Sequence, residues 1–88
     1  MLFRSGCKLH GTTVHFVTPA LDHGPIIIQA AVPVLQGDDE DKLATRVLKM
    51  EHKIFPQAVR WFTEERLQVR GGVVHLTGAN EPQFVVEA

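Results

Sequence analysis

Residues 10–34 read H-G-T-T-V-H-F-V-T-P-A-L-D-H-G-P-I-I-I-Q-A-A-V-P-V, two runs rich in β-branched residues on either side of a turn. The runs at 14–18 and 26–34 have the composition of β-strands, and the turn between them carries Pro, Gly and one carboxylate. The isoleucines at 26–28 do not alternate with polar residues, which is typical of a strand covered on both faces. Pro33 indicates an edge position or a strand end. These features predict an α/β fold in which helices cover the sheet.

A long amphipathic helix is predicted after these strands, over residues 39–65. Asp38 or Asp39 can cap it, and the acidic residues that follow favour the positive end of the helix dipole. Apolar residues recur at steps of three and four on one stripe, which we expect to face the sheet: Leu43, Val47, Met50, Ile54, Ala58 and Trp61. Pro56 interrupts the helix by removing a backbone donor and crowding the carbonyl of His52, so we expect a kink or a restart there.

The rest of the chain completes one small unit. A turn at Gly71–Gly72 predicts a β-hairpin over 66–77, and residues 78–88 are expected to form a partly ordered tail. With the strands and turn at 10–35 and the helix at 39–65, the 88 residues make one domain at most.

Composition excludes several classes of function. The 9 basic and 10 acidic side chains give a formal charge of −1, which argues against nucleic acid or an anionic membrane as a partner. No apolar stretch approaches the length of a membrane span, and no signal peptide is evident. The single Cys7 and histidines spread over different elements predict no metal site. We therefore expect a cytoplasmic protein.

Three segments, in order and spacing, resemble the phosphoribosylglycinamide formyltransferase family: H-G-T-T-V-H-F-V-T at 10–18, L-D-H-G-P-I-I-I-Q-A-A-V-P-V at 21–34, and E-H-K-I-F-P at 51–56. The resemblance implies the C-terminal part of a Rossmann-like formyltransferase fold. It also implies an activity in purine biosynthesis, the transfer of a formyl group from 10-formyltetrahydrofolate to glycinamide ribonucleotide.

The turn between the two strands resembles the folate loop of that family. The resemblance implies that Asp22 tunes a catalytic histidine and that folate binds along the loop, through Thr18, Pro19, Ala20, Leu21, Asp22, His23 and Gly24. The loop departs from many family members, because Pro19 removes a backbone donor and His23 adds bulk beside Asp22. His15 is a candidate to order Asp22, and a hydrogen-bonded structural histidine is the alternative.

The pair Glu51-His52, followed by I-F-P, resembles the glycinamide enzyme in particular. In that enzyme the matching Glu holds the ribose hydroxyls of the nucleotide. The resemblance therefore implies a substrate-binding segment made of Leu48, Lys49, Met50 and Glu51. Without the resemblance, Glu51 would be interpreted as a solvated helix residue.

The resemblance also indicates what these residues lack. The family's phosphate-binding Gly loop and its catalytic Asn and His belong to an N-terminal half, and no G-x-G-x-x-G occurs in these 88 residues. We expect a truncated part that is inactive alone, takes the N-terminal half as its partner, and self-associates through an unpaired sheet edge. The alternatives are a fragment of a formyltetrahydrofolate deformylase, which shares the L-D-x-G-P loop, and a non-enzymatic folate-binding module that complements a separate half.

Overall fold

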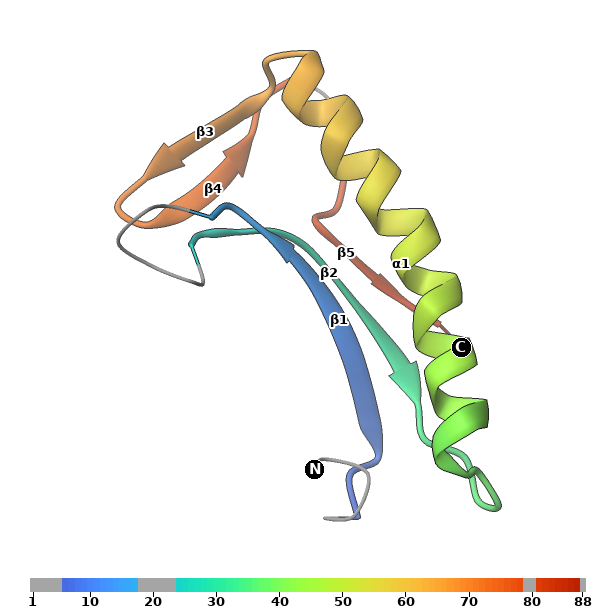
Figure 1. The fold of residues 1–88 in the computed structure, drawn as a ribbon. Coiled ribbons are helices and arrows are strands. Elements are labelled where there is room, and N and C mark those ends of the chain that lie inside the picture. The colour runs from blue at the N-terminus through green and yellow to red at the C-terminus, as the bar shows by residue number, and fades with distance from the viewer. Residues whose placement is uncertain (1–5, 18–23, 79–80, 88) are drawn as a thin grey trace.

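The computed structural model describes residues 6–17, 24–78 and 81–87. The elements run in the order β1 (Leu9–His15), β2 (Ile26–Pro33), α1 (Glu40–Thr63), β3 (Leu67–Arg70), β4 (Val73–Leu76) and β5 (Phe84–Val86). Figure 1 shows α1 lying along one face of a sheet made of β1, β2 and β5, with the β3–β4 hairpin at one end. This mixed α/β architecture confirms the predicted fold class.

The central strand of the sheet is β2. It pairs antiparallel with β1, starting from the pair Leu9–Pro33. A bulge lies between Val14 and His15, after which His15 pairs with Ile26. The strand was predicted at 14–18, but it begins at Leu9 and ends at His15, so that Phe16 and Val17 lie beyond it. Thr18 lies outside the described residues. The extra residue is Ile27 of β2, and because a bulge bends and twists the strand that carries it, β2 is redirected just after the turn.

The other neighbour of β2 is β5, which pairs with it in parallel. The register joins Gln29 to Phe84 and Ala31 to Val86. Residues 84–86, which the sequence placed in a partly ordered tail, thus form a strand of the sheet. A three-residue strand has no readable period, and its partner lies more than fifty residues away in the sequence, so no local pattern indicated the pairing.

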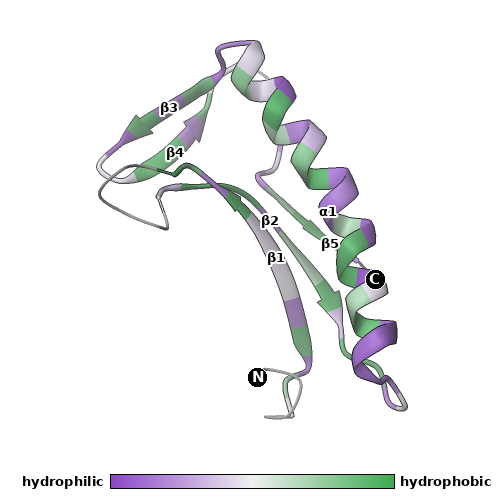
Figure 2. Ribbon diagram, viewed as in Figure 1, coloured by the Kyte–Doolittle hydropathy of each residue, from purple (hydrophilic) through white to green (hydrophobic). Residues whose placement is uncertain are grey.

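The core lies between β2 and α1, as the helical stripe predicted. Its buried side chains are Ile27, Ile28, Ala30 and Val32 from β2, Leu43, Met50, Ile54, Ala58 and Trp61 from α1, and Val74 from β4. Figure 2 shows that β2 and β5 are largely apolar, as is the side of α1 that they meet. In the described part of the chain α1 covers one face only, so the expected helices on both faces are not seen there. The same part contains no helix long and apolar enough to cross a membrane.

The two candidate caps at the start of α1, Asp38 and Asp39, make different contacts. Asp39 is the N-cap, and its side chain accepts from the Lys42 N–H at 2.8 Å. Asp38 instead accepts two hydrogen bonds from the Arg46 guanidinium, at 2.7 and 3.0 Å, and one from the Leu35 N–H at 2.7 Å. The Arg46 contact, reinforced by the Leu35 N–H, lowers the pKa of Asp38 to about 2. This cluster fixes the connection from β2 into the helix.

The helix continues through Pro56 to Thr63, so the expected restart does not occur. Proline removes one hydrogen bond, while the apolar stripe continues on both sides of it through Ile54 and Ala58, which are buried. Tertiary packing of this stripe outweighs the local cost of the proline.

A polar cluster anchors the end of α1 to the last segment of the chain. Glu81 accepts from the Trp61 indole N–H at 3.1 Å and from the Arg66 guanidinium at 3.1 Å. These contacts, that of Trp61 first, lower the pKa of Glu81. The Gln83 amide then donates to the Ile27 and Val74 carbonyls, both at 3.1 Å, and ties β2 to the hairpin.

Candidate functional site

Two backbone hydrogen bonds close the base of the predicted folate loop. The Phe16 N–H donates to the Pro25 carbonyl at 3.0 Å, and the Gly24 N–H donates to the Phe16 carbonyl at 2.8 Å. The Phe16 ring also meets the Phe62 ring edge-on, with centroids 6.4 Å apart, so the end of α1 supports this base. Gly24 is the member of the predicted loop that the structure describes. Thr18, Pro19, Ala20, Leu21, Asp22 and His23 lie outside the described residues.

His15 ends β1 just before that base and is half-buried. Its Nδ1 lies 3.0 Å from the Phe16 carbonyl oxygen, which fits a ring N–H donating to the backbone. Such a bond orients the ring beside the strand end. Because Asp22 is outside the described residues, the role of His15 in ordering it stays a prediction.

Glu51 lies on the side of α1 that faces β1. The Thr12 hydroxyl donates to Glu51 Oε1 at 3.1 Å, across 39 positions of sequence. Glu51 borders two shallow hollows between the strand and the helix. The first is lined by His10, Glu40, Leu43, Ala44, Val47, Leu48 and Glu51, and the second by Thr12, Thr13, Val14, Glu51, His52 and Phe55. A carboxylate at the junction of two hollows can accept hydrogen bonds from a hydroxylated ligand.

The four residues of the predicted substrate segment do not share one surface. Leu48 and Glu51 line the same hollow, because residues three apart share a helix face. Met50 belongs to the core, with 2% of its surface exposed. Lys49 instead borders a separate hollow beside Arg46 and Glu87. Of the four predicted substrate residues, the geometry therefore brings together Leu48 and Glu51 on one surface.

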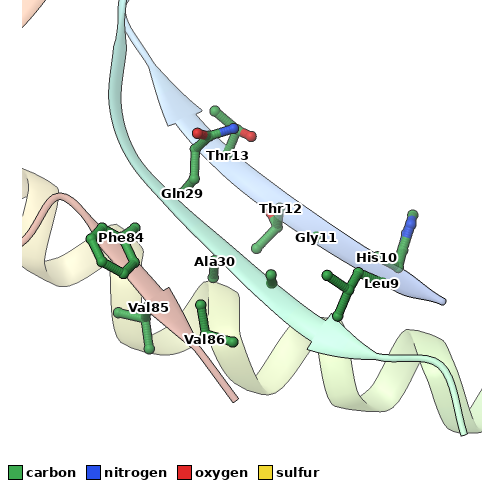
Figure 3. A pocket seen from close by; sticks show the side chains of 11 residues that line it. Leu9, His10, Gly11, Thr12, Thr13, Gln29, Ala30, Phe84, Val85 and Val86 are labelled. Carbon is green, nitrogen blue, oxygen red and sulfur yellow. The ribbon is translucent and has the colours of Figure 1, made fainter. Parts of the chain in front are cut away.

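The opposite face of the sheet carries a further hollow. Figure 3 shows its lining side chains, which come from β1, β2 and β5. Leu9, Phe84 and Val86 on these strands are 58%, 60% and 59% exposed. Gly11 of β1 also lines this hollow, and a Cβ there would overlap the Ala30 carbonyl oxygen. The exposed apolar side chains on this face are not covered by the described residues.

Sequence reasoning missed Thr12 and Phe16. The signal for Thr12 was the alternation of β1, which puts His10, Thr12 and Val14 on one face. That face of β1 meets α1, and the sequence alone does not indicate which face of a strand a distant helix covers. In the described residues, no three His, Cys, Asp or Glu side chains gather as a metal site would need.

Comparison with known proteins gives a consistent set of relatives. The family model described as formyl transferase matches residues 1–59. Phosphoribosylglycinamide formyltransferase of Escherichia coli is 46% identical over 78 residues, which cover 89% of this chain and 37% of that protein. The crystal structure of phosphoribosylglycinamide formyltransferase from Anaplasma phagocytophilum matches with a TM-score of 0.88 at 38% identity, over 97% of this chain and 41% of the other.

A formyltetrahydrofolate deformylase from Pseudomonas syringae also matches, with a TM-score of 0.80 at 30% identity, over 88% of this chain and 26% of the other. The chain thus spans well under half the length of each of these relatives. Both kinds of relative share the fold described above.

Proposed function

The chain belongs to the formyl transferase family, and from that membership we propose that it forms part of an enzyme that transfers a formyl group from 10-formyltetrahydrofolate to glycinamide ribonucleotide. The observation that carries the proposal is the arrangement of β1. Phe16, which follows its last residue, closes the base of the predicted folate loop, and Thr12 in its middle holds Glu51. One strand therefore connects the element assigned to the formyl donor with the element assigned to the acceptor.

The loop from Thr18 to Gly24 is assigned to the reduced folate. Formyl transfer passes through a tetrahedral intermediate, which needs stabilisation of an oxyanion and transfer of a proton. A histidine in the rest of the enzyme can supply both if a carboxylate holds it protonated, since a nearby opposite charge raises a histidine pKa. Asp22 is our candidate for that carboxylate. His15, on the strand that leads into the loop, is our candidate for orienting it.

Glu51 is assigned to the nucleotide. A carboxylate has room for about four hydrogen bonds, and the Thr12 hydroxyl takes one of these positions. The remaining acceptor positions suit the paired hydroxyls of a ribose. Leu48 and Glu51 line one hollow, where Leu48 can contact the apolar side of the sugar.

The partner that we propose is the remainder of a longer formyltransferase, equivalent to the N-terminal half expected from the sequence. That part would supply the phosphate-binding loop and the catalytic Asn and His. The 88 residues alone are accordingly assigned no activity. We place the enzyme in purine biosynthesis, in keeping with the name of its Drosophila melanogaster relative, a trifunctional purine biosynthetic protein. The cytoplasm is the location that we propose for it.

A second candidate is hydrolysis of formyltetrahydrofolate, which is favoured by the likeness to the Pseudomonas syringae deformylase. There water would replace the nucleotide amine as acceptor, and Glu51 would have no ribose to bind. The Glu51-His52 segment and the higher identity to the Escherichia coli transferase favour formyl transfer. The third hypothesis is a non-enzymatic folate-binding module. The following experiment distinguishes formyl transfer, hydrolysis and binding without catalysis.

The test uses two hybrid proteins. In the transferase hybrid, the 88 residues replace the matched segment of the Escherichia coli phosphoribosylglycinamide formyltransferase; in the deformylase hybrid, they replace that of the Pseudomonas syringae deformylase. Each is assayed with 10-formyltetrahydrofolate, with and without glycinamide ribonucleotide. We expect formylated nucleotide from the transferase hybrid and no formate from the deformylase hybrid. Formate release by the second without transfer by the first would overturn the proposal, and inactivity of both would favour a binding module.

A further inference from the structure

We propose that Thr12 is a positioning residue for the nucleotide: its hydroxyl holds Glu51 Oε1 and presents the rest of the carboxylate to the ribose. The inference rests on the proposed function of Glu51, and it adds a residue that the family resemblance did not supply. Its basis is the 3.1 Å hydrogen bond between the Thr12 hydroxyl and Glu51 Oε1.

Thr12 stands on a rigid part of the fold. It pairs with Ala30 in the middle of the β1–β2 ladder, and Ala30 belongs to the buried core with 4% of its surface exposed. The preceding Gly11 lets β1 approach the Ala30 carbonyl more closely than any side chain would allow. A β-branched side chain in a strand has few χ1 choices, so the direction of the hydroxyl is restricted. Thr12 therefore offers a donor at a fixed place.

Glu51 needs such a donor because its own position is not fixed by burial. It is an exposed residue on the surface of α1, and a glutamate side chain has three rotatable bonds. A mobile carboxylate must be ordered when it binds a ligand, and the lost rotamer freedom reduces affinity. The bond from Thr12 orders the carboxylate before the ligand arrives.

The bond also leaves the carboxylate chemically able to bind. A threonine hydroxyl donates one hydrogen and carries no charge, so the carboxylate keeps its full negative charge and its other lone pairs. A lysine or arginine in this place would pair with the charge and compete with the sugar hydroxyls. The neutral donor thus orients Glu51 without occupying its binding capacity.

The test measures steady-state kinetics of the transferase hybrid. Thr12→Val keeps the branched shape and removes the hydroxyl, and we expect the nucleotide KM to rise about threefold to tenfold, as for loss of one ordinary hydrogen bond. The kcat and the folate KM should stay within about twofold of wild type. Thr12→Ser keeps a hydroxyl and should restore most of the nucleotide KM. Thr45→Val removes an exposed hydroxyl that donates to the helix backbone at Asp41, and serves as the matched control.

A double-mutant cycle connects the effect to Glu51. In a Glu51→Ala background Thr12→Val should change the nucleotide KM no further, because nothing remains to be positioned. An equal effect of Thr12→Val in both backgrounds would overturn the inference, as would a silent Thr12→Val in an enzyme where Glu51→Ala raises the KM. If Glu51→Ala itself leaves the nucleotide KM unchanged, the proposed role of Glu51 fails first and the inference fails with it.

Discussion

The backbone N–H of Gly24 lies 2.8 Å from the carbonyl oxygen of Phe16, so close that a Cβ on Gly24 would overlap that oxygen. The two sides of the base of the predicted folate loop therefore meet where a side chain cannot fit. Loop binding sites depend on a rigid frame that fixes where the loop leaves and returns. Here Phe16, Gly24 and Pro25, which lie just beyond the end of β1 and just before the start of β2, make that frame.

Replacing Gly24 by alanine should therefore loosen the loop. Overfilling a close-packed site costs roughly 1–3 kcal/mol, and the strand ends would have to separate to relieve it. In the transferase hybrid we expect Gly24→Ala to lower the melting temperature and raise the folate KM. Gly71→Ala is the control, because it strains a hairpin turn at φ 58° with no atom in the way. It should reduce stability and leave the folate KM unchanged. Equal folate KM values for Gly24→Ala and Gly71→Ala would contradict the role of Gly24 in holding the base of the folate loop.

Asp22→Asn tests the charge that we assign to the loop. Asparagine is also a good turn former, so the shape of the loop is kept while the negative charge is lost. The pKa of the catalytic histidine should fall, and kcat of the transferase hybrid should drop by orders of magnitude with little change in either KM. The limb of the pH–rate profile that reports this histidine should move to lower pH.

Asp41→Asn, which removes an exposed carboxylate from the first turn of α1, is the control for Asp22→Asn and should leave kcat unchanged. A variant at Asp22 whose kcat stays within about twofold of wild type at every pH would rule out the electrostatic role.

The Asp38–Arg46 pair predicts how stability depends on pH. Because the folded-state pKa of Asp38 is lowered to about 2 from an ordinary value of 3.8, its contribution is fully present above pH 3.8. It is lost as the pH falls through 2. The stability difference between wild type and Asp38→Asn should therefore be constant near neutrality and shrink toward zero at pH 2. In Asp39→Asn the helix cap is kept, since Asn caps as well as Asp. Asp39→Asn therefore serves as the control, and denaturant unfolding at each pH measures the stability of both variants. A stability difference between wild type and Asp38→Asn that persists at pH 2 would argue against a contribution from the Asp38–Arg46 ion pair.

The uncovered sheet face predicts the behaviour of the 88 residues alone. Leu9, Phe84 and Val86 expose apolar surface there, around the hollow in Figure 3. Exposed apolar patches promote association, so we expect the chain to bind a hydrophobic dye and to scatter light as oligomers at micromolar concentration. Phe84→Ser should reduce both signals. A monomeric wild-type chain that binds no dye would show that this face needs no cover.

Local patterns predicted the elements whose signal lies within a few residues. The period of α1 identified its buried stripe, including Met50 and Trp61, because a helix repeats its face every three to four residues. The strand β5 and the Thr12–Glu51 contact were not predicted, because both join positions far apart in the sequence. For the site, the sequence indicated Glu51 by resemblance, and its setting between two hollows came from the structure. The role of Asp22 stays a prediction.

The most direct test of the role proposed for Glu51 is the nucleotide KM of the transferase hybrid carrying Glu51→Ala. Loss of a charged hydrogen-bond partner costs roughly 1.5–3 kcal/mol, so we expect the nucleotide KM to rise about tenfold to a hundredfold while the folate KM barely moves. Leu48 and Glu51 line the hollow that we assign to the nucleotide. Asp41→Ala removes an exposed carboxylate of α1 outside that lining and should leave both constants nearly unchanged. A Glu51→Ala variant that raises both KM values equally, or neither, would contradict the assignment of this hollow to the nucleotide.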